Sequence, residues 1–274
     1  MADCGGHFVW YELMTTDMEA AEAFYADVVG WGTRNASTPG LAYTLFTAGE
    51  TPVGGMMNLR GDAGKIGAEP RWIGYVGVDD VDAAVKRLEQ LGGTVHVPPT
   101  DIAGISRFSV VADPQMATLV LVKWLSPALP EPAQSGRIGS VGWHELLAAD
   151  HGKALDFYQR LFGWQKGTTE VGSIGTYQLF SAGGETIGGM FTKPPAVPMP
   201  FWLYYFRVGD IDAALKRVVA GGGEILEGPI EVPGGTWSAR CVDAQGAMFA
   251  LTGPRDRNIP GYFERAGSRE RWSW

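Results

Sequence analysis

Two glutamates recur in the same local context and are the strongest candidates for chemistry. Trp10 and Glu12 lie in "FVWYELMTTD", and Trp143 and Glu145 lie in "VGWHELLAAD". Residues two apart on a strand point to the same face, so each tryptophan is expected beside its glutamate. A carboxyl group in an apolar, aromatic pocket has a raised pKa unless it is hydrogen-bonded, and a raised pKa suits a general acid or base near neutral pH.

The two stretches belong to a repeat that covers most of the chain. "AFY" ending at Tyr25 matches "DFY" ending at Tyr158, and "VDDVDAAVKRLEQLGG" from Val78 matches "VGDIDAALKRVVAGGG" from Val208. Between the copies, residues 125–140 are rich in proline, serine and glycine and lack periodicity, as is typical of a linker. We predict a first domain over residues 1–125, a linker over 126–138, a second domain over 139–254 and a C-terminal tail over 255–274.

Each copy also contains two similar halves. In the first half, a strand over Phe8–Met14 precedes a helix that begins at Thr16 or Asp17, and the strands "AYTLFTA" and "PVGGMMNL" follow. The second half repeats this order with a strand over Trp72–Val78, a helix over Val81–Leu91, and the strands "RFSVVAD" and "TLVLV". The predicted fold class is α+β, with four βαβββ modules in tandem.

Composition excludes several classes of partner. The net charge is -8 and no basic cluster interrupts the chain, so nucleic acid is not an expected partner. Two cysteines, Cys4 and Cys241, form neither a disulfide framework nor a metal-binding spacing, which favours a reducing cytoplasm. No signal architecture and no run of ~18 apolar residues is present, so neither export nor a membrane span is expected.

The sequence resembles the vicinal oxygen chelate superfamily, which includes glyoxalase I, extradiol dioxygenases, fosfomycin-resistance enzymes and bleomycin-resistance proteins. The resemblance is carried by "TTDMEAAEAFYADVVGW", "AADHGKALDFYQRLFGW", "VDDVDAAVKRLEQLGG" and "VADPQMATLVLV", and it covers nearly all of residues 7–253. Two tandem copies that contain "GGM" look like the two-domain glyoxalase-like proteins. The resemblance implies curved mixed sheets that enclose cavities, and it leaves open whether neighbouring or non-neighbouring halves share a cavity.

The resemblance also implies where a divalent metal would bind. The matching positions on the first, fourth and last strands of each copy are Trp10, Ile73 and Val120, and Trp143, Leu203 and Ala250. None of these side chains can bind a metal ion, and a working centre normally needs three oxygen or nitrogen donors. We therefore expect no metal and no other cofactor. If the alignment with the family is shifted by one residue, His144 takes the position of a metal ligand, but strand alternation turns its side chain away from the cavity. We expect the four histidines to lie on the surface or in loops.

Strand alternation predicts which side chains replace the metal set. The inward residues are Trp10, Glu12, Met14, Ile73, Tyr75, Thr118 and Val120 in the first copy, and Trp143, Glu145, Leu147, Leu203, Tyr205, Met248 and Ala250 in the second. Glu12 with Tyr75 and Glu145 with Tyr205 are the candidate catalytic pairs. The alternative is that each glutamate has only a structural role, in which it caps backbone amides or pairs with an arginine. Arg207 is the candidate arginine, and the residue that matches Arg207 in the first copy is Gly77.

Other residues are candidates for contact with a substrate. Trp10, Trp143, Trp72 and Trp202 offer flat surfaces for stacking, although such tryptophans are also common in the core, and Met248 and Arg207 complete the predicted binding set. The "GGM" motif lacks the lysine and the helix of a phosphate loop, and we expect it to let two strands approach closely or bulge.

These residues favour a metal-independent member of the superfamily that takes up a small hydrophobic or aromatic molecule. The first hypothesis is an enzyme of isomerase, cyclase or lyase type. The alternatives are a binding protein that sequesters a drug or natural product, and a metal-dependent glyoxalase or dioxygenase. We expect a monomer or a homodimer, with the tail over a cavity mouth or against a neighbouring subunit if it is ordered.

Overall fold

The computed structural model describes residues 5–38, 40–59, 69–125, 136–172 and 175–255. The first domain contains β1 (Phe8–Thr15), α1 (Met18–Val29), β2 (Gly32–Asn35), β3 (Tyr43–Ala48), β4 (Thr51–Asn58), β5 (Arg71–Gly77), α3 (Val81–Gln90), β6 (Thr94–Ile102), β7 (Ser106–Ala112) and β8 (Thr118–Trp124). The second contains β9 (Val141–Ala148), α4 (His151–Phe162), β10 (Gln165–Gly172), β11 (Gly175–Ala182), β12 (Glu185–Thr192), β13 (Phe201–Arg207), α5 (Ile211–Ala220), β14 (Glu224–Val232), β15 (Thr236–Val242) and β16 (Met248–Gly253). The α+β class and the four tandem βαβββ modules are confirmed.

The two sheets have the same strand order. The first runs β2-β3-β4-β1-β5-β8-β7-β6 and the second runs β10-β11-β12-β9-β13-β16-β15-β14. The central pairs, β1 with β5 and β9 with β13, are antiparallel, whereas their outer neighbours are parallel to them, so both sheets are mixed. Each sheet is therefore formed by two modules that follow each other in the sequence. The sequence left open whether neighbouring or non-neighbouring modules share a sheet.

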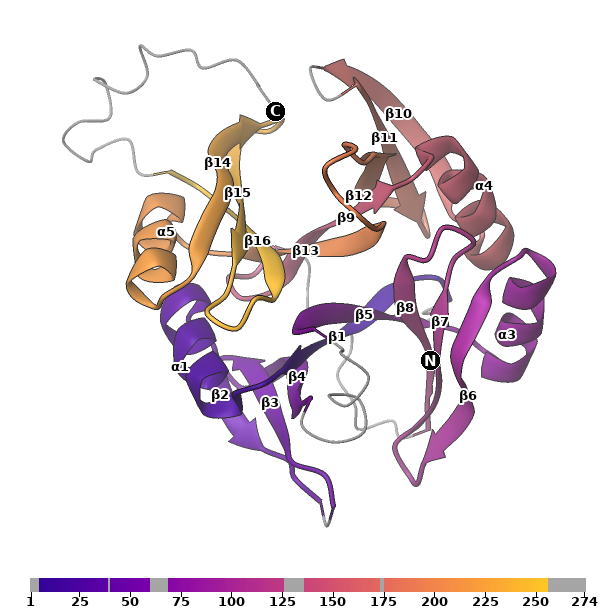
Figure 1. The fold of residues 1–274 in the computed structure, drawn as a ribbon, viewed down its shortest axis with the longest axis horizontal. Helices are drawn as coiled ribbons and strands as arrows, with labels where there is room; N and C mark the ends of the chain where they lie inside the picture. The colour runs from indigo at the N-terminus through magenta and orange to yellow at the C-terminus, as the bar shows by residue number, and fades with distance from the viewer. Residues whose placement is uncertain (1–4, 39, 60–68, 126–135, 173–174, 256–274) are drawn as a thin grey trace.

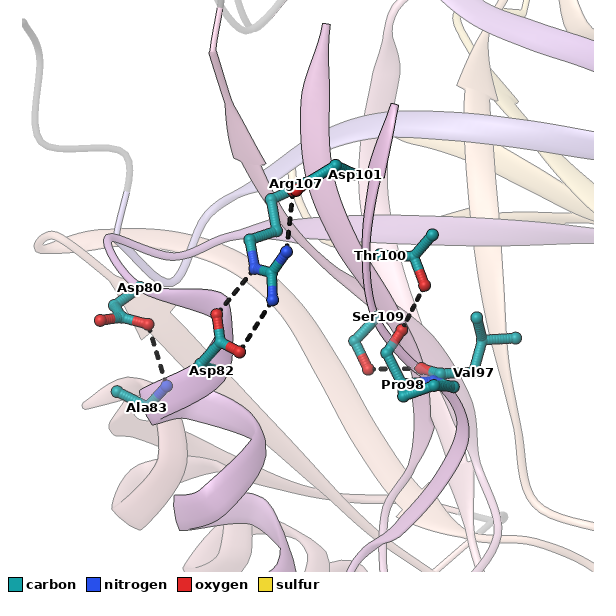
Figure 2. Close-up of polar contacts among 9 residues, drawn as sticks. All are labelled: Asp80, Asp82, Ala83, Val97, Pro98, Thr100, Asp101, Arg107 and Ser109. Atoms are coloured by element: carbon teal, nitrogen blue, oxygen red, sulfur yellow. Dashed lines mark hydrogen bonds and ion pairs between the residues drawn. The ribbon is translucent and has the colours of Figure 1, made fainter. Parts of the chain in front are cut away.

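Each of the four helices in the described part of the chain begins after an aspartate. Asp17, Asp80, Asp150 and Asp210 each adopt an extended conformation and accept a hydrogen bond from the backbone amide three residues later. This N-cap satisfies one of the amide groups that the first turn leaves unbonded, and the predicted start of the first helix is confirmed at Asp17. Figure 2 shows the cap of α3 at Asp80, next to Arg107, which joins Asp82 of the helix to Asp101 of β6.

The two domains pack through their helices and central strands. In Figure 1, α1 lies beside α5 and α3 lies beside α4, so each helix pair joins opposite domains. The Tyr25 hydroxyl of α1 donates to Asp243 at 3.0 Å, and the Tyr158 hydroxyl of α4 donates to Asp113 at the same distance. The F-Y motif and the repeated aspartate are therefore parts of a symmetric contact between the domains.

The G-W motif serves the same contact. The indole of Trp31 donates to the Gly139 carbonyl at 2.7 Å, and the indole of Trp164 donates to the Gly6 carbonyl at 2.6 Å. Each tryptophan thus binds the segment that leads into the other domain's first strand. The two indoles are almost completely buried, so these hydrogen bonds satisfy N–H groups that would otherwise be costly to bury.

His144 lies between the two sheets and corrects the expectation that every histidine is on the surface or in a loop. Its ring stacks on Phe8 with centroids 4.2 Å apart, and its Nδ1 is 2.6 Å from the Ile187 carbonyl. Because a carbonyl can only accept, Nδ1 carries the proton, and Nε2 accepts from the Tyr11 hydroxyl at 2.6 Å. Burial lowers the pKa of His144 to about 4, so the ring is neutral at pH 7.

Strand alternation does turn His144 away from the cavity face, as predicted, because its neighbours Trp143 and Glu145 point to the opposite side. The residues of the predicted linker from 126 to 135, and the tail from 256 onward, lie outside the described residues. Within the described part of the chain, no helix is both long enough and apolar enough to cross a membrane.

Candidate functional site

The sheet of the second domain encloses a cavity of about 470 Å³ on its concave side. Its floor and walls combine aromatic, charged and small residues: Gly142, Trp143, Glu145, Glu170, Val171, Tyr177, Leu179, Tyr205, Arg207, Glu227, Ile230, Glu231, Val232, Pro233, Thr236, Ser238, Ala239, Arg240 and Thr252. Below the floor, a small apolar cluster of Leu147, Phe191, Leu203, Tyr205 and Ala250 packs against Met248 and Trp143. A cavity of this size and composition suits a small organic molecule.

Glu145 is the centre of a hydrogen-bond network at the floor of this cavity. Its Oε1 accepts from the Tyr177 hydroxyl at 3.0 Å, and its Oε2 accepts from the Tyr205 hydroxyl at 2.8 Å. The guanidinium of Arg240 also donates to Oε2 at 2.8 Å and reaches Glu227 at 2.7 Å with its other terminal nitrogen. The carboxylate is only 3% exposed, so these partners replace the water that burial removes.

The "GGM" glycines make room for this network. Gly189 is the neighbour of Glu145 across the β9–β12 ladder, and a Cβ added to it would overlap the Tyr177 ring. Tyr177 therefore crosses β12 over a residue without a side chain to reach the glutamate on β9. In the first domain, Gly55 stands opposite Glu12 and leaves the same space for the Tyr43 ring. We predicted that these glycines let two strands approach closely or bulge; at Gly55 and Gly189 the space that they leave is filled by a tyrosine ring.

Glu12 holds the equivalent place in the first domain. It accepts from the Tyr43 hydroxyl at 2.9 Å and from Tyr75, and the Trp10 indole donates to the same Tyr43 hydroxyl at 3.2 Å. Burial raises the pKa of the Glu12 carboxyl above its ordinary value, and the hydrogen bonds from Tyr43 and Tyr75 oppose that increase. The predicted pairing of each glutamate with a tyrosine, Glu12 with Tyr75 and Glu145 with Tyr205, is present in the structure.

The two glutamates nevertheless have different electrostatic environments. On the strands that correspond to β14, β15 and β13, the first domain has Val97, Val110 and Gly77 where the second has Glu227, Arg240 and Arg207. Glu145 therefore faces a cation, whereas Glu12 has tyrosine hydroxyls and apolar neighbours. The repeat conserves the glutamate and its tyrosines, and it varies the charges around them.

Several predicted binding residues occupy the places expected for them. Trp143 and Arg207 line the second cavity, and the Trp143 indole donates to the Tyr177 hydroxyl at 2.8 Å. Met248 packs against the apolar cluster under the cavity floor. Trp10 is buried on the same face as Glu12, where its ring meets Trp124 edge-on at 6.3 Å.

Trp72 and Trp202 require a correction, because the structure places them on the opposite face of each sheet. The Trp72 indole donates to the Tyr25 hydroxyl at 2.8 Å, and the Trp202 indole donates to the Tyr158 hydroxyl at 3.2 Å. Both rings are buried in the core under the helices. Strand alternation gives the reason, since Trp72 is adjacent to Ile73, which belongs to the cavity side.

The arginine that pairs with Glu145 is Arg240 and not the predicted Arg207. Arg207 lines the cavity but does not donate a hydrogen bond to Glu145 among the described contacts. Arg240 donates this hydrogen bond. Tyr43, Tyr177, Glu227 and Arg240 were missed because they lie on strands that were left out of the list of inward residues. The available signal for Arg240 was a charged residue in the mostly apolar strand "TWSARCV", at the position of Val110 in the first copy.

Neither glutamate site, as far as its residues are described, has a set of donors that fits the divalent metal of the vicinal oxygen chelate mechanism. The central strands of each sheet place one carboxylate on this face, Glu12 or Glu145, and the positions that match the metal ligands hold tryptophan, isoleucine, leucine, valine or alanine. The Glu145 oxygens are engaged by two hydroxyls and a guanidinium, which a metal ion would have to displace. Within the described residues, no group of three histidine, cysteine, aspartate or glutamate side chains is placed to hold a metal.

Comparison with known proteins shows the family. Residues 7–121 and 137–251 each match the model of the Glyoxalase/Bleomycin resistance protein/Dioxygenase superfamily, and the chain belongs to it. A putative glyoxylase of Mycobacterium tuberculosis, CFP32, is 33% identical over 248 residues, covering 89% of this chain and 94% of that protein. The anthracycline biosynthesis protein DnrV of Streptomyces peucetius is 30% identical over 272 residues, covering 94% and 95%.

Solved structures share the fold at low sequence identity. The Mn(II)-bound glyoxalase of Novosphingobium aromaticivorans superposes with a TM-score of 0.64 at 18% identity and covers 91% of this chain and 82% of its own. The 2,2',3-trihydroxybiphenyl 1,2-dioxygenase of Sphingomonas wittichii also superposes with a TM-score of 0.64, at 13% identity, covering 91% and 90%. Two tandem glyoxalase-like domains are therefore the architecture of the chain.

Proposed function

We propose that this protein binds a small, largely hydrophobic aromatic molecule in the cavity of its second domain and transforms it by acid/base chemistry without a metal ion. The observation that carries the proposal is the position of a buried carboxylate, Glu145, at the floor of an aromatic-lined cavity of about 470 Å³. The reaction class is that of an isomerase, cyclase or lyase. Glu12 provides a second carboxyl group of the same kind in the first domain.

The chemistry assigned to Glu145 is proton transfer at Oε1. Of its two oxygens, Oε2 receives both Tyr205 and Arg240, whereas the only described donor to Oε1 is Tyr177. A carboxylate oxygen has two acceptor directions, so Oε1 is the atom that can accept a proton from a ligand. Tyr177 and Tyr205 then hold the carboxylate in one orientation, and Trp143 supplies a flat surface against which a planar ligand can stack.

The poor fit of the donor set to a metal supports the metal-independent part of the proposal. Incubation with Mn²⁺, Zn²⁺ or a chelator is expected to leave ligand binding and turnover unchanged. Stoichiometric metal in the purified protein, with loss of activity after chelation, would instead revive the glyoxalase or dioxygenase alternative.

The names of the relatives support an aromatic natural product as the ligand. DnrV is named as a protein of anthracycline biosynthesis, and it is similar to this chain over nearly the whole length of both. Binding of an anthracycline aglycone to the purified protein tests this directly. Quenching of tryptophan fluorescence measures binding, and the Trp143→Phe variant is expected to lose most of the quenching while it keeps its fold.

Catalysis and simple binding are separated by the fate of the ligand. Mass spectrometry of the bound aglycone detects a change in its structure, and Glu145→Gln is expected to abolish that change while binding persists. Glu12→Gln is the matched variant in the other domain. If the wild-type protein returns the ligand chemically unchanged, the acid/base proposal fails.

The second candidate function is a non-catalytic binding protein, and one observation favours it. Arg240 forms an ion pair with Glu145 and also donates to Glu227, an arrangement that suits a carboxylate whose role is to hold the barrel. In that case the ligand is retained unchanged and Glu145→Gln lowers stability rather than turnover.

A further inference from the structure

Arg207 is a charged residue of the second cavity that the acid/base network does not use. It ends β13 and lines the cavity, and its buried Nε has no hydrogen-bond partner in the described part of the chain. A buried N–H group without a partner costs free energy, so its persistence calls for an acceptor that is supplied from outside the chain.

The neighbouring strand is shaped to accommodate this side chain. A Cβ added to Gly142 of β9 would lie 2.7 Å from the Arg207 Nε and within 3.0 Å of its Cζ. In the first domain, the larger and the smaller residue change places. Val9 stands at the position of Gly142, and Gly77 stands at the position of Arg207. The cavity of the second domain thus has both the arginine and the space for it, whereas the matching positions of the first domain provide neither.

The other charges of the cavity leave Arg207 available. Glu145 and Glu227 are bonded to Arg240, and no ion pair joins either of them to Arg207 among the described residues. The remaining carboxylates of the cavity, Glu170 and Glu231, are solvent-exposed, where water and salt weaken their repulsion of an anion. A guanidinium in a partly enclosed site binds a carboxylate, sulfonate or phenolate more strongly than a neutral acceptor.

We propose that Arg207 anchors an anionic oxygen group of the ligand, so that the second cavity selects acidic aromatic molecules over neutral ones of the same shape. This inference rests on the proposed function, because it assigns a chemical class to the ligand of that cavity. It also distinguishes the two domains, since the first domain has Gly77 at the position of Arg207.

Two fluorescent probes of nearly the same shape test the assignment. The anionic probe is 1-anilinonaphthalene-8-sulfonate, and the neutral probe is N-phenyl-1-naphthylamine, which lacks the sulfonate. The intact protein is expected to bind the anionic probe more tightly. Ser238→Trp fills the cavity from the wall formed by β15 and is expected to abolish binding of both probes, which locates them there.

Three variants then isolate the guanidinium. Arg207→Met keeps the length of the side chain and is expected to weaken the anionic probe roughly 10- to 100-fold while leaving the neutral probe unchanged. Gly142→Val introduces the residue of the first domain and is expected to give the same selective loss, because it displaces the guanidinium without removing its charge. Arg160→Met, at an exposed arginine of α4, is the control and is expected to change neither affinity.

The outcomes separate this inference from the function on which it rests. If both probes bind and Arg207→Met weakens them equally or not at all, the anionic site is overturned and the aromatic cavity stands. If neither probe binds the intact protein, or if Ser238→Trp leaves both affinities unchanged, the aromatic cavity and the anionic site fail together. Selective loss in both Arg207→Met and Gly142→Val supports the assignment.

Discussion

The Glu145 carboxylate and the Arg240 guanidinium form a 2.8 Å ion pair whose side chains are 4% and 12% exposed. The matching residues of the first domain are Glu12 and Val110, so the glutamate is kept there and the arginine at this position is not. Among the described residues, the two domains thus hold a buried carboxyl group in two ways, Glu145 with a guanidinium and Glu12 with tyrosine hydroxyls. The difference leads us to expect opposite effects of mutation at the two sites.

Arg240→Met is expected to destabilise the protein by roughly 3–5 kcal/mol, because it leaves the buried Glu145 carboxylate without its cation. Equilibrium unfolding in urea, followed by circular dichroism, measures the change in the free energy of unfolding. Adding Glu145→Gln to Arg240→Met is expected to recover part of the loss, since the amide needs no counter-charge. If the double variant is as unstable as the sum of the two single variants, the two residues are not energetically coupled.

Glu12→Gln is expected to stabilise the protein at neutral pH, in contrast to changes at Glu145. Because burial raises the pKa of Glu12, the folded state binds more protons than the unfolded state between the ordinary pKa of 4.5 and the raised value. Stability contributed by this group therefore falls as pH rises through that interval and is constant above it. Each unit of raised pKa corresponds to about 1.4 kcal/mol.

The measurement is the free energy of unfolding of Glu12→Gln and of the wild-type protein across the same pH series. The gap between the two curves is expected to widen in favour of the variant as pH rises above 4.5. Parallel curves would show that Glu12 is ionised as easily in the folded protein as in the unfolded chain.

Local patterns predicted most of the fold because each is short in range. An aspartate before an apolar-periodic segment indicated where the first helix starts, and Asp17 caps α1 as expected; Asp80 caps α3 in the same way. Period-two alternation placed Glu12 and Tyr75 on one face of neighbouring strands, and the structure joins them. Because the sequence repeats, the same patterns predicted the matching helix start and the matching glutamate–tyrosine pair in the second domain.

The partners of the glutamates could not be predicted because they depend on register across three or more strands. Tyr177 of β11 reaches β9 only because Gly189 lies between them, and Arg240 of β15 reaches Glu145 past Ala250 and β13. No local period encodes such a path. The structural role of Trp72 was missed for a related reason, since its hydrogen-bond partner Tyr25 lies on a helix whose packing joins the two domains.

His144 is expected to make folding sensitive to acid. Burial lowers its pKa to about 4 from the ordinary 6.5, so the unfolded state binds more protons in that interval, and stability falls as pH decreases from 6.5 to 4. The full effect is about 3 kcal/mol. His144→Phe keeps the stacking on Phe8 but does not titrate, so its stability deficit relative to the wild type is expected to shrink by this amount as pH is lowered.

Nuclear magnetic resonance of the His144 ring provides an independent measurement of this titration. A ring that becomes charged near its ordinary pKa in the folded protein would contradict the prediction. The hydrogen bonds to Ile187 and Tyr11 fix the neutral tautomer, so the Nδ1 proton is the resonance to follow.

Tyr25→Phe is expected to weaken the contact between the domains by roughly 1–3 kcal/mol, because it removes the donor to Asp243 and the acceptor of the Trp72 indole at once. Tyr158→Phe removes the matching pair and is expected to cost a similar amount. The two sites lie at separate helix pairs in Figure 1, so their effects are expected to add within about 0.5 kcal/mol. Urea unfolding of both single variants and of the double variant measures this sum, and a second change with no further cost would show that the two contacts break together.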